Sequence, residues 1–275
     1  MRYVSPPDVN ALPTLRDLED SLEPALRLVV RSVRLQIQAA CVQFDAATPG
    51  SLHQLVAVGL SKQVKDTLAS IFKGRKGAFR RVFDGLTDHF EGTGNATCPY
   101  CNFGEQWEHD HYLPKGIFPE FTLYAKNLIP ICKTCNSKKS TQYEAAGARL
   151  FMHLFSELDG AQGLLSVTVE YDPRIAVSFS LINPGLPAMQ FQVLQSHFVK
   201  LGLARRYARQ ASTTLGRMIK RLRTQENLAL GRSRLRRRLR SMATDRALQC
   251  HENHWEVVLL KKLASSPEFT EHIFS

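Results

Sequence analysis

The sequence contains two cysteine pairs of the same spacing, Cys98-Pro99-Tyr100-Cys101 and Cys132-Lys133-Thr134-Cys135, and they frame the stretch that decides the fold. Between them stands Glu108-His109-Asp110-His111-Tyr112-Leu113-Pro114-Lys115, followed by Asn127, and Asn136 comes directly after the last cysteine. Two cysteines separated by two residues present both sulfur atoms to one ion, so two such pairs predict a tetrahedral zinc site. We expect this metal to hold the enclosed His, Asp and Asn residues around one active site.

A Cys-Pro-Tyr-Cys motif is also typical of glutaredoxins, in which a cysteine of low pKa at the start of a helix exchanges disulfides. That fold requires a strand directly before the motif and a helix directly after it. Here Gly94 and Asn95 precede the pair, and Asn102-Phe103-Gly104 predicts a turn after it. The second cysteine pair has no role in redox exchange, so the sequence favours a zinc site.

Positive charge is concentrated in one part of the chain. The sequence has 36 Lys and Arg against 25 Asp and Glu, which gives a formal net charge of +11. Residues 201–240 alone hold 13 of these basic residues and one acid, Glu226. A polyanionic partner requires such a segment, because neutralised phosphates release their counterions; a solvated arginine-rich helix face explains the charge equally well. Nucleic acid is the first candidate partner and an acidic membrane surface the second.

The composition excludes several classes of protein. Hydrophobic residues make up 44% of the chain and charged residues 22%, a balance typical of a folded core and not of disorder. No uncharged apolar run approaches the roughly 18–20 residues that span a bilayer. Residues 1–7 lack the apolar segment of a signal peptide. We therefore expect a cytoplasmic protein that does not enter the membrane.

Helical periodicity dominates the chain on both sides of the cysteine frame. Alternating residues on either side of Asp172-Pro173-Arg174 predict a β-hairpin over residues 167–182. Pro24 predicts a kink or a restart within the first helical segment. The segments expected to be helical are residues 14–42, 51–71, 79–90, 145–158 and about 190 to the end.

The residues inside the cysteine frame resemble a known nuclease signature. Asp110 to Lys115, then Asn127-Leu128-Ile129-Pro130, then Cys132 to Lys139 are similar to the HNH endonucleases in their four-cysteine zinc form. They are similar in particular to a bacterial subgroup associated with phage defence or restriction. The resemblance covers residues 98–139 and implies the ββα-metal fold.

The resemblance implies a role for each of these polar residues. His111 would be the general base that activates water, a task suited to an imidazole with a pKa near neutrality. Asp110 and Asn136 would bind one catalytic Mg²⁺ or Mn²⁺, since hard oxygen ligands favour hard cations. The amide of Asn127 would hold the loop that carries the base. A structural Zn²⁺ would be bound by Cys98, Cys101, Cys132 and Cys135.

Several of these residues also have ordinary structural interpretations. Asn136 could simply cap the helix after the second cysteine pair, and Asn127 could simply begin a turn. His109 could be a further ligand or part of the strand surface, and we favour the surface. The residues expected to contact phosphates are Lys115, Lys138, Lys139, Arg232, Arg234, Arg236, Arg237, Arg238 and Arg240.

The predicted fold class is α+β and mostly helical. A ββα-metal HNH zinc module (residues 93–145) is inserted between an N-terminal helical region (1–92) and a C-terminal region (146–275) that holds the hairpin, helices and arginine-rich segment. We expect a metal-dependent HNH endonuclease that hydrolyses phosphodiester bonds in DNA, in phage defence or restriction. The alternative is a zinc-dependent nucleic-acid-binding module without catalysis, acting with a partner protein as a subunit of a defence complex.

Overall fold

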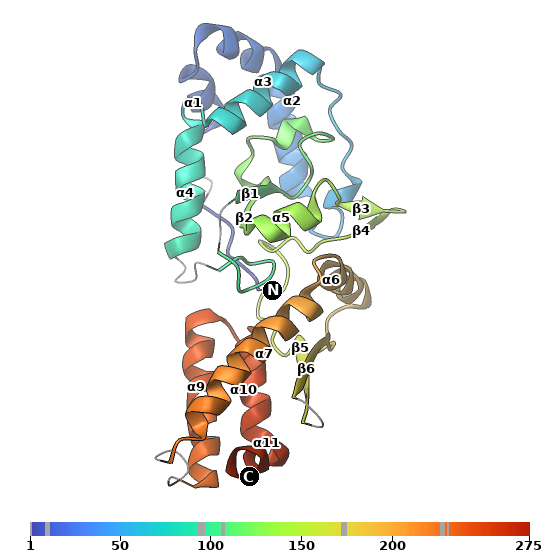
Figure 1. Cartoon of the computed structure of the whole chain (residues 1–275). Coiled ribbons are helices and arrows are strands. Elements are labelled where there is room, and N and C mark those ends of the chain that lie inside the picture. The colour runs from blue at the N-terminus through green and yellow to red at the C-terminus, as the bar shows by residue number, and fades with distance from the viewer. Residues whose placement is uncertain are drawn as a thin grey trace. The chain divides into compact units, whose positions relative to one another are not determined.

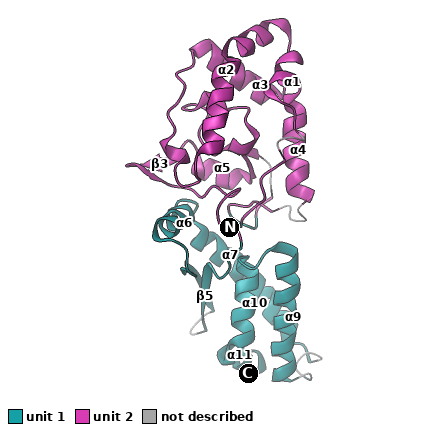
Figure 2. Ribbon diagram, turned by 180° about the vertical axis from the view of Figure 1, so that it is seen from behind, with its two compact units in different colours: residues 1–2, 101–103, 160–275 teal, residues 3–100, 104–159 magenta. Residues whose placement is uncertain are grey.

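The structure is a computed structural model, and its elements are labelled in Figure 1. It describes residues 2–8, 12–92, 97–105, 108–171, 175–225, 229 and 231–275. The contacts divide the chain into two compact units, coloured in Figure 2. The N-terminal unit holds residues 3–100 and 104–159, and the C-terminal unit holds residues 1–2, 101–103 and 160–275. The N-terminal helices and most of the zinc module therefore share one unit.

Four α-helices open the N-terminal unit. They are α1 (Leu15–Asp20), α2 (Pro24–Ala46), α3 (Lys62–Gly74) and α4 (Phe79–Gly92), with a short 3₁₀ helix, η2 (Leu52–Gln54), before α3. Thr14 caps α1: its hydroxyl accepts from the Asp17 N–H, and the Asp17 carboxylate accepts from the Thr14 N–H. Pro24 stands at the first position of α2, where its missing N–H costs nothing, so the chain restarts there.

The helix expected over residues 51–71 begins later than predicted. Regular helix starts at Lys62, because the Ser61 hydroxyl accepts the Val64 N–H at 3.4 Å and caps it there. Residues 55–60 have no regular secondary structure. The apolar residues before Ser61 are unevenly covered: Leu52 and Leu60 are buried, whereas Val56 is exposed.

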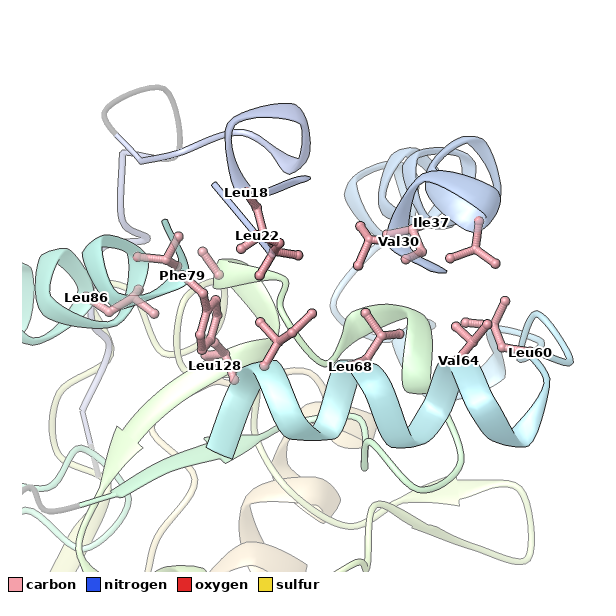
Figure 3. Close-up of a cluster of buried hydrophobic side chains, with 14 residues drawn as sticks. Leu18, Leu22, Val30, Ile37, Leu60, Val64, Leu68, Phe79, Leu86 and Leu128 are labelled. Atoms are coloured by element: carbon pink, nitrogen blue, oxygen red, sulfur yellow. The ribbon is translucent and has the colours of Figure 1, made fainter. Parts of the chain in front are cut away.

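A core of apolar side chains joins these helices to the zinc module, as Figure 3 shows. Val30 and Ile37 of α2 face Val64 and Leu68 of α3, and Leu128 joins them from the module. Each such side chain contributes about 1.5–3 kcal/mol when it is fully buried. The helices thus hold the strand that contains Leu128.

The zinc module consists of two strands and a helix: β1 (Glu108–His111), β2 (Leu128–Ile131) and α5 (Lys133–Lys139). The strands are antiparallel, with Glu108 opposite Ile131 and His111 opposite Leu128. The loop between them contains two 3₁₀ helices, η3 (Pro119–Phe121) and η4 (Ala125–Asn127). The predicted fold class, mostly helical α+β with a ββα module, is confirmed.

The helix expected over residues 145–158 does not form. The chain makes two short strands there, β3 (Glu144–Ala145) and β4 (Ala148–Arg149), joined by Ala146 and Gly147 at φ of 50° and 76°. The apolar residues that follow are buried without a polar face between them; they are Leu150, Phe151, Met152, Leu154, Phe155 and Leu158. The spacing of these apolar residues resembles the period of a helix, but it arises from their burial in the tertiary structure.

The C-terminal unit consists of a β-hairpin and five described helices. The predicted hairpin is confirmed as β5 (Leu165–Glu170) paired with β6 (Ala176–Leu181). Its turn, residues 172–174, lies outside the described residues. Glu226, the one acid of the basic segment, also lies outside them. The helices are α6 (Ala188–Lys200), α7 (Leu203–Leu222), α9 (Arg232–Cys250), α10 (Trp255–Ser265) and α11 (Pro267–Phe274). α7 packs on β6, and α10 packs along α9 and β5. Within the described parts of the chain, no helix combines the length and apolar character needed to cross a membrane.

Candidate active site

The four cysteines of the zinc module converge on one point. Their Sγ atoms lie within 4.8 Å of one another, and all four side chains are buried. Cys132 is the N-cap of α5, and its sulfur accepts the Cys135 N–H at 3.4 Å. In the first loop, Asn102 has a φ of 59° and the Cys98 N–H donates to the Gly104 carbonyl at 2.5 Å. The donor set and its spacing fit a tetrahedral Zn²⁺ with Zn–S bonds of about 2.3 Å.

Successive side chains of β1 point to opposite sides of the strand, as the pleat requires. Glu108 and Asp110 face α5, and the Asn136 amide donates from Nδ2 to Glu108 Oε2 at 2.5 Å. His109 and His111 face the aromatic side chains of α4 and α3. The carboxylates and the imidazoles therefore occupy different sides of one short strand.

Lys139, at the end of α5, is the partner of Asp110. Its Nζ lies 3.0 Å from Asp110 Oδ2 and donates to the His111 carbonyl at 2.8 Å, and its side chain is fully buried. Burial raises the pKa of Asp110 to about 6, and the charge of Lys139 opposes that rise. The expected phosphate contact of Lys139 does not fit this placement. Lys138 is exposed on the same helix.

His111 is held in one tautomer. Its Nε2 lies 2.9 Å from the Thr122 carbonyl, which can only accept, so Nε2 carries the proton and Nδ1 has the free lone pair. The ring centroid lies 4.5 Å from that of Phe72 on α3. Burial, together with the charges of Lys115 and Lys139, lowers the pKa of His111 to about 3. The ring is thus neutral at pH 7, with a pKa well below the near-neutral value that the sequence suggested.

Both the oxygen and the nitrogen of the Asn127 side-chain amide make hydrogen bonds, and these connect two parts of the loop after β1. Its Oδ1 accepts the Leu113 N–H at 2.8 Å. Its Nδ2 donates to the Leu113 carbonyl at 3.0 Å and to the Phe121 carbonyl at 3.3 Å. The side chain is fully buried. These bonds fix the chain segment that follows His111.

The remaining candidates near β1 lie on its aromatic side. His109 lies against Phe83, with 3.8 Å between the ring centroids, and the guanidinium of Arg75 lies 3.7 Å from the Phe83 centroid. Burial lowers the pKa of His109 to about 4. Lys115 is exposed, and its Nζ lies 4.6 Å from the centroid of Phe72, the ring that also contacts His111.

The arginines expected to contact phosphates lie in α9, in the C-terminal unit. Two of them are bound to α11: Arg232 donates to both carboxylate oxygens of Glu271, at 2.5 and 2.9 Å, and Arg236 donates to the Thr270 hydroxyl at 3.2 Å. The others expected from the sequence, Arg234, Arg237, Arg238 and Arg240, are exposed.

Sequence reasoning missed three partners at this site. Glu108 shares the α5 side of β1 with Asp110, and the two-residue period of a strand could have shown it. Phe72 and Thr122 come from segments whose contact with His111 no local pattern reveals. Their contribution becomes visible only when the helices pack on the module.

The α5 side of β1 offers the ligands of a hard divalent cation. Glu108 and Asp110 supply carboxylate oxygens, and Asn136 supplies an amide oxygen beside them. Mg²⁺ and Mn²⁺ prefer such oxygen ligands. These are the donor types that such a cation takes, and the ammonium group of Lys139 contacts both oxygens of Asp110.

Two antiparallel strands, a following helix and a four-cysteine cluster make up a ββα module. The sequence model of the family described as "HNH endonuclease" matches residues 98–142. The chain therefore contains a domain of the HNH endonuclease family.

Two curated proteins are similar to parts of the chain. Protein ea31 of Escherichia phage lambda is 27% identical over 193 residues, which is 62% of each chain. Septu protein PtuB of Bacillus thuringiensis is 38% identical over 52 residues, which is 17% of this chain and 20% of PtuB. The chain thus spans less than two thirds of the length of either relative. No solved structure gives a significant match to the chain.

Proposed function

We propose that this protein is a metal-dependent endonuclease that hydrolyses phosphodiester bonds in DNA, with His111 as its general base. The observation that carries this proposal is the orientation of His111. Nε2–H of His111 donates to the Thr122 carbonyl, which leaves Nδ1 of a neutral ring to accept a proton from water. Asp110 and Asn136, with Glu108 beside them, would hold Mg²⁺ or Mn²⁺, which when bound neutralises charge on the scissile phosphate.

The other residues of the site would position the base and the substrate. Asn127 holds the loop after His111 through three hydrogen bonds, so the segment directly after the base is fixed. Lys115 is exposed beside the ring that His111 contacts and would bind a phosphate oxygen next to the attacked bond. Lys138 would bind a neighbouring phosphate from the exposed side of α5. The Zn²⁺ would be structural, because its four thiolates leave no open position.

The setting we propose is the bacterial cytoplasm, in phage defence or restriction. Four cysteines that bind zinc as thiolates must stay reduced, which fits a reducing compartment. The resemblance of the motif to defence-associated HNH proteins, and the similarity to a phage protein and to Septu protein PtuB, support a phage-related role. A partner protein would then supply target recognition.

A nucleic-acid-binding module without catalysis is the second candidate. Two observations favour it. The carboxylates and the imidazoles lie on different sides of β1, so a cation at Asp110 would not share a side of the strand with His111. Asp110 is also 4% exposed and paired with the buried Lys139, so a cation must share or displace that contact. The two candidates agree on zinc and on nucleic acid, and they differ only in hydrolysis.

Plasmid cleavage separates them. We expect the wild-type protein to nick or cut supercoiled plasmid with Mg²⁺ or Mn²⁺ and to stop when EDTA is added. Asp110→Ala and Asn136→Ala should need more Mn²⁺ for half-maximal cleavage, because each removes an oxygen ligand. If the wild-type protein binds plasmid but cuts it with neither ion, the nuclease proposal is wrong and the binding module without catalysis is favoured.

A further inference from the structure

A groove in the C-terminal unit combines arginines with an apolar floor. It has a volume of about 440 Å³ and lies between α7, α9 and α10. Arg217 and Arg221 line it from α7, and Arg238 and Arg246 line it from α9. Trp255 of α10 contributes to the lining. The expected nucleic-acid contacts in α9 included only one of these arginines, Arg238.

Most of the polar groups that line this groove can only donate hydrogen bonds. Guanidinium groups and the indole N–H are donors without an acceptor atom. Trp255 is 4% exposed, and its Nε1 has no hydrogen-bond partner among the described residues. The one acid among the described lining residues, Glu256, is already paired with Arg246 at 2.7 Å. The groove therefore suits an anion with several acceptor oxygens.

The arginines of α9 divide between two faces of the helix. Arg238 and Arg246 are eight residues apart, with Met242 midway, so all three lie on one face and line the groove. Arg232 and Arg236 face α11 and are bound there. Arg238 and Arg246 are thus the arginines of α9 that line the groove.

The floor of the groove is apolar. Met218 and Leu222 come from α7, Met242 from α9, and Leu259 and Leu260 from α10; Met242 is 38% exposed. The volume lies within the range of about 300–1,000 Å³ that is typical of ligand pockets. A duplex keeps its bases stacked and would bring only phosphates and sugars to such a floor. An unpaired nucleotide brings both a phosphate and an exposed base.

We propose, on the basis of the nuclease function proposed above, that this groove binds an unpaired nucleotide of a nucleic-acid strand. Its phosphates lie against Arg217, Arg221 and Arg238, and a phosphate oxygen accepts the Trp255 N–H. Its base lies on the apolar floor. The groove is then a second nucleic-acid site, in the C-terminal unit, in addition to the HNH site.

The test compares two triple variants of the full chain, each with His111→Ala so that the strand is not cut. One removes three charges from the groove: Arg217→Gln, Arg221→Gln and Arg238→Gln. The matched control removes three exposed charges from α7 outside the groove, at residues not among the expected phosphate contacts: Arg205→Gln, Arg209→Gln and Lys220→Gln. Binding of a labelled single-stranded oligonucleotide is followed by fluorescence anisotropy over a range of salt concentrations.

We expect the groove variant to raise Kd at least tenfold and the control variant to raise it less than threefold. The slope of log Kd against log salt should fall by about 1.4 in the groove variant, since the bound nucleotide is flanked by two phosphates and each phosphate contact on a single strand contributes about 0.7. Circular dichroism checks that both variants are folded. An equal loss of affinity in the two variants would overturn the proposal, because binding would then depend on the total positive charge and not on its position in the groove.

Tryptophan fluorescence reports on the groove directly. Trp107→Phe leaves Trp255 as the only tryptophan of the chain, and its emission should change as the oligonucleotide is added. A duplex of the same sequence should change it less, and a nucleoside monophosphate should do so only at far higher concentration. A monophosphate that acts at the concentration of the oligonucleotide, or an equal response to the duplex, would overturn the proposal. Failure of the nuclease proposal is seen separately, as absent plasmid cleavage by protein with His111 intact.

Discussion

At the scale of single residues, the site contains a buried ion pair between Asp110 and Lys139, and burying both charges costs free energy. The two side chains are 4% and 0% exposed, and they join β1 to the last residue of α5. Removing two charges from water costs several kcal/mol for each ion, and their mutual attraction must offset that cost. The pair is therefore sensitive to the loss of either member.

We expect Lys139→Met to lower the free energy of unfolding by about 3–5 kcal/mol, because it leaves the Asp110 carboxylate buried without a counter-charge. Urea denaturation measures this loss. Lys138→Met, at an exposed position of the same helix, should change it by no more than about 0.5 kcal/mol. Adding Asp110→Asn to Lys139→Met should recover part of the loss. Equal stability of the two lysine variants would mean that the ion pair does not form in solution.

His153 makes the folded state sensitive to acid. It is 4% exposed, its ring lies 4.6 Å from Tyr112, and burial, with the charge of Arg149 adding to it, lowers its pKa to about 4. In the unfolded chain the pKa is about 6.5, so between these values the unfolded state binds a proton that the folded state does not. This contribution to stability is complete above about pH 6.5 and is lost on acidification, by up to about 1.4 kcal/mol per pH unit.

His153→Gln should therefore flatten the pH dependence of the free energy of unfolding between about pH 4.5 and 6.5. The measurement is urea denaturation of both proteins at several pH values. An unchanged slope in the variant would assign the acid sensitivity to other groups, such as the zinc thiolates.

At the scale of elements, the zinc cluster adds to the apolar core that the small module shares with the helices. β1 and β2 contain four residues each, and α5 contains seven. Zinc bound by four thiolates can contribute on the order of 10 kcal/mol to a small module. The strands and the helix are therefore expected to depend on the metal for their order.

We expect about one tightly bound zinc per chain by elemental analysis. Cys132→Ser and Cys135→Ser should lose the metal and the order of β1, β2 and α5, seen as reduced near-ultraviolet circular dichroism. Cys41→Ser, outside the cluster, should keep both. A zinc-free protein that is folded and active would refute the structural site.

The elements differ in how far the sequence could predict them. The cysteine spacing and the resemblance predicted the ββα module, and alternation predicted the hairpin of β5 and β6. Periodicity failed at two places: the apolar residues between Leu150 and Leu158 are buried without forming a helix, and the helix expected from residue 51 starts only after Ser61. The Ser61 cap was readable in the sequence, but the burial of Leu150 to Leu158 was not.

At the scale of the whole molecule, the N-terminal helices contribute directly to the candidate site. Phe72 of α3 contacts His111, and Phe83 of α4 contacts His109. The sequence predicted these helices as a separate region, because periodicity identifies an apolar face and not the surface that it covers. The low pKa of His111 has the same origin, since the burial that lowers it depends on a helix 39 residues away in the chain.

The central claim, that His111 activates the water that attacks the phosphodiester, is tested by single-turnover cleavage of bound DNA. We expect His111→Ala to lower the cleavage rate by about 10²–10⁴-fold, the usual contribution of a positioned general base, while zinc content and DNA affinity stay near wild type. His109→Ala, which removes the neighbouring imidazole from the same side of β1, should lower the rate less than tenfold. Cleavage by His111→Ala at the wild-type rate would contradict the account.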